Sequence, residues 1–146
     1  MVGFKKSLII PLAVGGLLLG GAAPSGAAET DVEPLHAITC SWDSGVGTPW
    51  SVDADTVKGF VRVKCSDSLD SANTQAQIQY LYGYEWKDKG VENVSYSTAT
   101  TIHVNDSTTK VQGRWLYRTK GQHYGQHGNI WALPTYYSPS RYLTRS

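Results

Sequence analysis

The feature that most constrains the fold of this 146-residue chain is the alternation of apolar and polar residues in TVKGFVRVKC. Because successive side chains of a β-strand point to opposite faces, this pattern predicts a strand with one buried face. No window of the chain sustains the apolar spacing of three and four that an α-helix would need. In steps of two, the segment places apolar residues on one face and basic residues on the other: Val57, Val61, Val63 and Cys65 against Lys58, Arg62 and Lys64.

The same two-residue period recurs in the rest of the chain, with turn residues between the segments. KDKG at 87–90 and Asn-Asp-Ser at 105–107 are predicted turns, and IWALPTYY and RYLT are predicted short strands. About seven short strands predict an all-β fold, either a small antiparallel sandwich of immunoglobulin-like architecture or a small barrel. The apolar faces of the remaining segments are Ile38, Cys40 and Trp42; Ile78, Tyr80, Tyr82, Tyr84 and Trp86; Val94, Tyr96, Ile102 and Val104; and Val111, Trp115 and Tyr117.

The two cysteines both fall on the apolar side of their segments, as a bridge inside the core requires. Oxidation of such a pair is expected in an exported protein, so we predict one structural disulfide between Cys40 and Cys65. The two residues are too close in sequence for the long-range bridge of a true immunoglobulin domain. The sequence therefore predicts the sandwich architecture without that family.

The first 28 residues have the composition of a secretory signal peptide. Lys5 and Lys6 precede an apolar stretch from Leu8 to Leu19, and small residues continue to Ala28. The apolar stretch is shorter than the ~20 residues that span a bilayer. We therefore predict cleavage after Ala28 and a secreted, extracellular single domain at 29–146, with no membrane span in the mature form.

Several segments together resemble those of small secreted, single-disulfide, β-rich proteins of high-GC Gram-positive bacteria, most of which are uncharacterised. These segments are the export signal, the early cysteine followed by Trp42, the strand GFVRVKC, the Tyr-rich middle strands and the late WLYRTKG and YSPS. The resemblance covers most of the mature chain. It implies a sandwich with one bridge and assigns a role to no residue.

Two histidines four residues apart, His123 and His127, raise the question of a metal site in GQHYGQHGN. Gly121, Gly125 and Gly128 disfavour a helix there. In a strand the two histidines would share a face ~13 Å apart, which is too far for one ion with bonds near 2 Å. We therefore predict a flexible polar hairpin, with no metal site and no cofactor.

The stretch WDSGVG around Ser44 is similar to the surroundings of the nucleophile in trypsin-like proteases. Those enzymes need two barrels and a distant histidine, whereas His36 lies only eight residues upstream in a chain of half the necessary size. Asp, Ser and Gly are turn formers, so the segment is predicted to be a turn.

Three carboxylate pairs could serve glycosidic acid-base catalysis or calcium binding. A glycosidase needs a sugar-binding cleft between its two carboxyl groups, which a small sandwich seldom forms, and the D-x-D at 53–55 lacks the other oxygen ligands of a calcium loop. We expect these acids to be solvated and predict no catalytic residue. The pairs are Asp53 with Asp55, Asp67 with Asp70, and Glu85 with Asp88.

Charge is distributed unevenly along the mature chain. From Ser107 onward there are six basic residues and no acidic one, whereas 29–106 holds 12 acidic and five basic residues. Cationic and aromatic side chains together can hold sugar rings or anionic polymers and are common at protein interfaces. The candidate binding residues are Arg114, Arg118, Lys120, Tyr124, Tyr136, Tyr137 and Arg141.

A second interpretation of the same charges is that the bases pair with acids across neighbouring strands. Nucleic acid is a poor ligand, because without Lys5 and Lys6 the chain has 11 basic and 12 acidic residues and no basic footprint. We predict a monomeric, non-enzymatic exported protein that binds an extracellular protein or an envelope glycan. Two alternatives stay open: an inhibitor of extracellular hydrolases that presents GVGTPWSVDAD as a loop, and a small secreted hydrolase.

Overall fold

The computed structural model describes residues 37–146, which form an all-β unit of two antiparallel sheets that curl into a half-barrel. The predicted signal peptide at 1–28 lies outside the described residues. No helix within 37–146 is long and apolar enough to cross a membrane. The predicted fold class, including the single disulfide, is confirmed.

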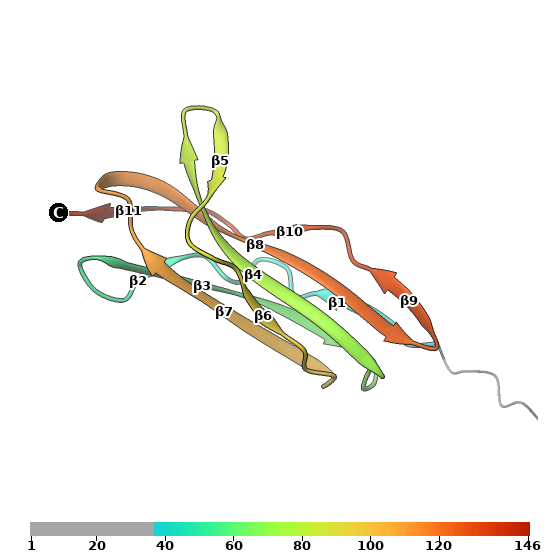
Figure 1. The fold of residues 1–146 in the computed structure, drawn as a ribbon. Helices are drawn as coiled ribbons and strands as arrows, with labels where there is room; N and C mark the ends of the chain where they lie inside the picture. Colours follow the sequence, from blue (N-terminus) through green and yellow to red (C-terminus); the bar gives the residue numbers. More distant parts are fainter. Residues whose placement is uncertain (1–36) are drawn as a thin grey trace, which may run out of the picture. The chain divides into compact units, whose positions relative to one another are not determined.

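The first sheet is built around β3 (Thr56–Cys65). One edge of β3 pairs over most of its length with β7 (Thr101–Thr109). Its other edge pairs with two short strands, β1 (Cys40–Trp42) and β2 (Trp50–Ser51). Figure 1 shows β3 and β7 running side by side below the second sheet.

The second sheet is built around the long pair β4 (Ser71–Tyr82) and β8 (Gly113–His127). The free edge of β4 pairs with β5 (Glu85–Asp88) and β6 (Asn93–Ser95). The free edge of β8 pairs with β9 (Asn129–Ala132), β10 (Tyr136–Tyr137) and β11 (Arg141–Arg145). In Figure 1, β4 and β8 cross the molecule together.

The core lies between the inner faces of the two sheets. The predicted inner face of β3 is confirmed, because its valines are fully buried and its basic residues lie on the other face. The side chains of Cys40, Trp42 and Cys65 pack against the buried apolar cluster, as the alternation of apolar and polar residues in their segments predicts. The buried cluster consists of Val61, Val63, Leu69, Ala72, Ala76, Ile102 and Val104.

A buried carboxylate joins the two sheets where the β4 edge is interrupted. β5 pairs with residues 79–82 of β4 and β6 pairs with residues 74–76, so neither strand reaches Ile78. Asp106 of β7 fills this gap, because its Oδ2 accepts a hydrogen bond of 2.7 Å from the Ile78 N–H. Its Oδ1 accepts another from the Ser107 N–H at 2.8 Å. Burial raises the pKa of the Asp106 carboxyl, while these backbone donors lower it by a smaller amount.

Several local predictions are wrong. The turn predicted at 87–90 begins too early, because Lys87 and Asp88 are the last residues of β5, and Tyr96, predicted on an apolar face, is exposed. Residues 105–107 form part of β7 and are not a turn, because Asp106 points inward to reach Ile78. Residues 121–127 are regular β8 strand and not a flexible hairpin, and the turn comes only at Gly128, which has a φ of 70°. The face predicted from Ile78 to Trp86 breaks at the turn between β4 and β5, where Tyr84 is fully exposed.

Replacing Asp106 tests how much this carboxylate contributes to the fold. Asp106→Ala leaves the Ile78 N–H buried without its acceptor, so we expect the free energy of unfolding to fall by about 1–3 kcal/mol. Urea unfolding followed by tryptophan fluorescence measures the loss. Ser107→Ala, on the exposed face of the same strand, is the matched control and should change stability by less than about 0.5 kcal/mol. Equal stability of the two variants would contradict this role of Asp106.

Candidate functional site

The outer face of the β4–β8 pair carries a dense array of amide side chains. The strand register brings Gln79 opposite Arg118, Gln77 opposite Lys120, and Gln75 opposite Gln122. Asn73 and Tyr124 form the next pair along the same face. We call this surface the polar face. It is defined by Ser71, Asn73, Gln75, Gln77 and Gln79 of β4 and Arg118, Lys120, Gln122, Tyr124 and Gln126 of β8.

At one end of the polar face, Arg118 is held between two aromatic rings. Its guanidinium carbon lies 4.1 Å from the centroid of Trp86 and 3.8 Å from that of Tyr137. Its Nε donates a hydrogen bond of 2.9 Å to Oε1 of Gln79. Burial lowers the pKa of Arg118, but a guanidinium remains charged at neutral pH. This arrangement fixes one cation and two rings in a single orientation.

The middle of the polar face is a small polar cleft of about 60 Å³, lined by Gln75, Gln77, Asp88, Glu92, Lys120 and Gln122. Asp88 accepts a hydrogen bond of 2.7 Å from the Gln79 amide and lies 3.3 Å from Nζ of Lys120. Gln77 is turned toward the backbone and donates to the carbonyl of Lys89 at 3.0 Å. A volume near that of two water molecules suits one or two polar substituents of a larger ligand rather than a whole ring.

A second, wider groove of about 320 Å³ continues the polar face beyond the cleft. Three side chains around it are exposed: Tyr96 after β6, Tyr124 of β8 and Ile130 of β9. Asn73 and Gln126 supply polar groups between them. From Ser71 to Gln79 the face is ~26 Å long at ~3.3 Å per residue, which fits an extended ligand better than a compact one.

The structure brings five of the seven predicted binding residues onto this outer surface. Arg118, Lys120 and Tyr124 lie on the polar face, Tyr137 covers Arg118, and Arg114 lies farther along β8 with its guanidinium carbon 4.4 Å above the Tyr142 ring.

The other two predicted binding residues lie elsewhere. Tyr136 points into the molecule, where it stacks on Trp42 and donates its hydroxyl hydrogen to the Val46 carbonyl. Arg141 pairs with the inward-facing Tyr117 at the sheet edge, so it shares the inner side of the sheet.

The basic residues of the C-terminal part differ in their contacts. Lys120 forms an ion pair with Asp88, and Arg145 forms one with Asp55 at 2.7 Å, as expected if the basic residues pair with acidic ones. Arg114 and Arg118 instead contact aromatic rings. Lys110 is buried, and its Nζ donates to the Ser51 hydroxyl and to the carbonyls of two other segments. The basic residues therefore do not form one continuous patch.

Segment 45–55, the loop GVGTPWSVDAD that an inhibitor would present, is anchored to the core over much of its length. Thr119 donates its hydroxyl hydrogen to the Gly47 carbonyl at 2.8 Å, and Pro49 is fully buried. Residues 52–55 form its exposed end, where Asp53 accepts hydrogen bonds from the backbone of Asp55 and Thr56. These bonds lower the pKa of the Asp53 carboxyl.

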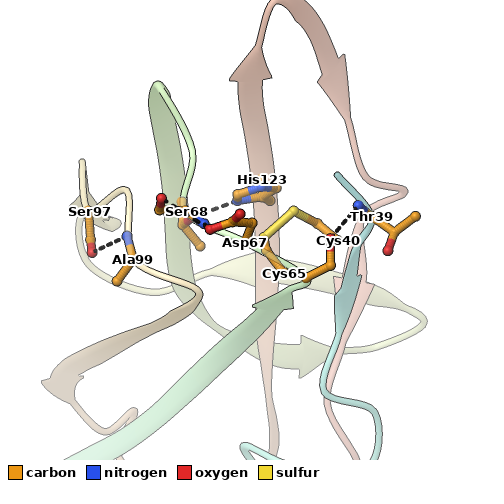
Figure 2. Close-up of a disulfide and its surroundings, with 10 residues drawn as sticks. Thr39, Cys40, Cys65, Asp67, Ser68, Ser97, Ala99 and His123 are labelled. Atoms are coloured by element: carbon orange, nitrogen blue, oxygen red, sulfur yellow. Dashed lines mark hydrogen bonds between the residues drawn. A yellow bond between two sulfur atoms is a disulfide. The ribbon is translucent and has the colours of Figure 1, made fainter. Parts of the chain in front are cut away.

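On the opposite, inner face of β8, His123 lies against the disulfide. The Cys40 and Cys65 pair joins β1 to β3, and an imidazole nitrogen of His123 lies within 4.8 Å of both sulfurs (Figure 2). Nδ1 of His123 forms a hydrogen bond of 2.7 Å with the Thr74 hydroxyl. Nε2 is buried and has no hydrogen-bond partner within residues 37–146. Burial lowers the pKa of His123.

The two glycines beside His123 are needed for close packing rather than for a turn. A Cβ added at Gly121 would lie 2.9 Å from the Trp42 ring, and one at Gly125 would lie 2.8 Å from the Trp131 ring. Sequence reasoning missed this cluster because it compared His123 only with His127. His127 shares the inner face but lies near Asp70, with 3.3 Å between Nδ1 and Oδ1.

Comparison of the chain with protein-family models, with curated proteins and with solved structures finds no match.

The burial of His123 predicts how stability depends on pH. The folded pKa lies below the unfolded value of about 6.5, so below that value the unfolded chain binds the proton more readily. Stability is therefore fully present above pH 6.5 and falls as the pH drops toward the folded pKa. Urea unfolding of the oxidised protein between pH 7.5 and 5.5 should show this decline.

His123→Gln should remove most of that slope, because glutamine does not titrate. His103→Gln is the control, since His103 is exposed on β7, and it should keep the slope. Parallel stability curves for the unaltered protein and His123→Gln would refute the assignment.

Proposed function

We propose that this protein is an exported, non-enzymatic binding protein that holds a glycan of the cell envelope on its polar face. The observation that carries the proposal is the polar cleft, which places amide, carboxylate and ammonium groups within one small hollow. A sugar hydroxyl is both a donor and an acceptor, and so is a glutamine amide. Gln75 and Gln122 can therefore satisfy hydroxyl groups in either sense.

The charge of the polar face favours a largely uncharged ligand. Lys120 is offset by Asp88, and Glu92 lines the same cleft. A polyanion would meet these carboxylates and be repelled, whereas hydroxyl groups can bond to them. Arg118 is already stacked and hydrogen-bonded, so its cation is less exposed than the sequence suggests.

The rings around the polar face supply apolar contact for a saccharide. Tyr124 and Tyr96 are exposed beside the wider groove, where the flat face of a sugar ring can pack on them. The length of the face suits several linked sugars. Recognition by a few polar groups and aromatic side chains is the usual composition of a specific binding site.

The proposed location outside the cytoplasm rests on two features of the chain. The disulfide indicates an oxidising compartment, where such bonds persist. The N-terminal pattern of Lys5, Lys6 and the apolar stretch is typical of an export signal. An envelope glycan would be accessible to a protein delivered there.

The glycan hypothesis is tested by binding to an array of soluble bacterial-envelope oligosaccharides, followed by calorimetry on the best ligand. Gln122→Ala removes an amide from the cleft, so we expect the Kd to rise about tenfold, equivalent to ~1.4 kcal/mol. Gln112→Ala is the matched control, because Gln112 is an exposed glutamine outside the polar face that bonds to the Arg145 carbonyl. It should leave the Kd unchanged.

Four results would contradict the proposal. Binding to no oligosaccharide, or equal binding by Gln122→Ala, would remove the polar face as a glycan site. Conversion of the oligosaccharide to products during the titration would show an enzyme instead. Capture of a protein by the unaltered chain, lost in an Arg114→Glu and Arg118→Glu double variant, would favour a protein partner.

A further inference from the structure

The disulfide and His123 form a compact group of metal-ligating atoms on the inner face, away from the polar face. The two sulfurs and one imidazole nitrogen lie within 4.8 Å of one another. They come from three strands, because Cys40 lies on β1, Cys65 on β3 and His123 on β8. Both sheets therefore contribute to the group (Figure 2).

The imidazole of His123 is positioned as in many metal sites. A ligating histidine commonly uses one nitrogen for the metal and bonds the other to a neighbouring polar group that orients the ring. Here the Thr74 hydroxyl takes Nδ1, which leaves Nε2 for a ligand. Nε2 belongs to a side chain that is 1% exposed and has no hydrogen-bond partner within residues 37–146. A buried polar atom of this kind is unusual in a folded protein.

We propose that reduction of the Cys40–Cys65 disulfide creates a Zn²⁺ site formed by the two thiolates and the imidazole of His123. Thiolate and imidazole ligands are those that zinc prefers. Three protein ligands leave the fourth tetrahedral position for water, and the two cysteines are only partly buried, so water and a reductant can reach them. With the disulfide closed, neither sulfur is a thiolate and the site does not bind.

A dithiol can serve as the reductant that breaks the Cys40–Cys65 disulfide. Its two S–H bonds break, its sulfurs join in a new disulfide, and two electrons and two protons pass to the sulfurs of Cys40 and Cys65. Zn²⁺ then displaces the two thiol protons, which leave to solvent. The metal therefore binds one redox state only, and by linkage it favours that state.

The direct test is a Zn²⁺ titration of the protein reduced with a phosphine, compared with the oxidised protein. We expect one Zn²⁺ per reduced chain and none in the oxidised chain. Co²⁺ in place of Zn²⁺ gives a visible spectrum that reports thiolate ligation. Near-ultraviolet circular dichroism, recorded in parallel, follows whether the reduced chain with Zn²⁺ keeps its packed core.

Variants assign the ligands. His123→Gln should weaken Zn²⁺ binding by at least about tenfold, since even loss of an outer-shell partner costs about 10- to 100-fold. His127→Gln is the matched control, because His127 lies on the same face of β8 but near Asp70, and it should bind as the unaltered protein does. A Cys40→Ser and Cys65→Ser double variant should not bind.

A second measurement tests the coupling between Zn²⁺ binding and disulfide reduction and needs no variants. In a dithiol redox buffer, after correction for the Zn²⁺ that the dithiol itself binds, free Zn²⁺ should raise the equilibrium constant for reduction of the disulfide by a factor of about 1 + [Zn²⁺]/Kd. An unchanged constant would overturn the proposal. So would equal Zn²⁺ affinity in His123→Gln and the unaltered protein, or a reduced chain whose near-ultraviolet spectrum in the presence of Zn²⁺ differs from that of the packed, oxidised protein.

Discussion

The pairing of β4 with β8 is the interaction on which the rest of the structure depends. It is the long central pair of the second sheet, and every other strand of that sheet attaches to one of its two edges. Because side chains alternate along both strands, the same pairing produces two faces of different chemistry. The outer face collects amides and Arg118, whereas the inner face carries Thr74 and His123 toward the disulfide.

The two sheets are held together by different kinds of contact along their length. Near the disulfide, apolar side chains of β3, β4 and β7 form the buried cluster. Where β5 gives way to β6, the Asp106 carboxylate replaces the missing strand partner of Ile78. Farther along, the Thr119 hydroxyl reaches across to the Gly47 carbonyl. A small sandwich thus closes its interior with a few buried polar bonds where apolar side chains do not fill it.

The location of Asp106 and His123 shows why local turn and composition signals failed. Asn-Asp-Ser is a typical turn sequence, and glycines beside histidines are typical of loops. In the fold, Asp106 accepts a hydrogen bond from the backbone N–H of Ile78, which lies twenty-eight residues earlier in the chain and which neither β5 nor β6 reaches. The Trp42 ring on the other sheet packs so close to Gly121 that it leaves no room for a side chain there. Neither requirement is visible in a local window, because each comes from a residue distant in sequence.

The sequence by itself determined the inner face of β3 and the disulfide, since a two-residue period dictates which side chains share a face and both cysteines fell on the apolar one. It also identified Arg118, Lys120 and Tyr137 as one neighbourhood. Only the tertiary structure decided that Gln75, Gln77 and Gln79 lie beside them and that His123 meets the two sulfurs. Strand register and sheet packing set these contacts, and both depend on hydrogen bonds between segments that the local pattern does not specify.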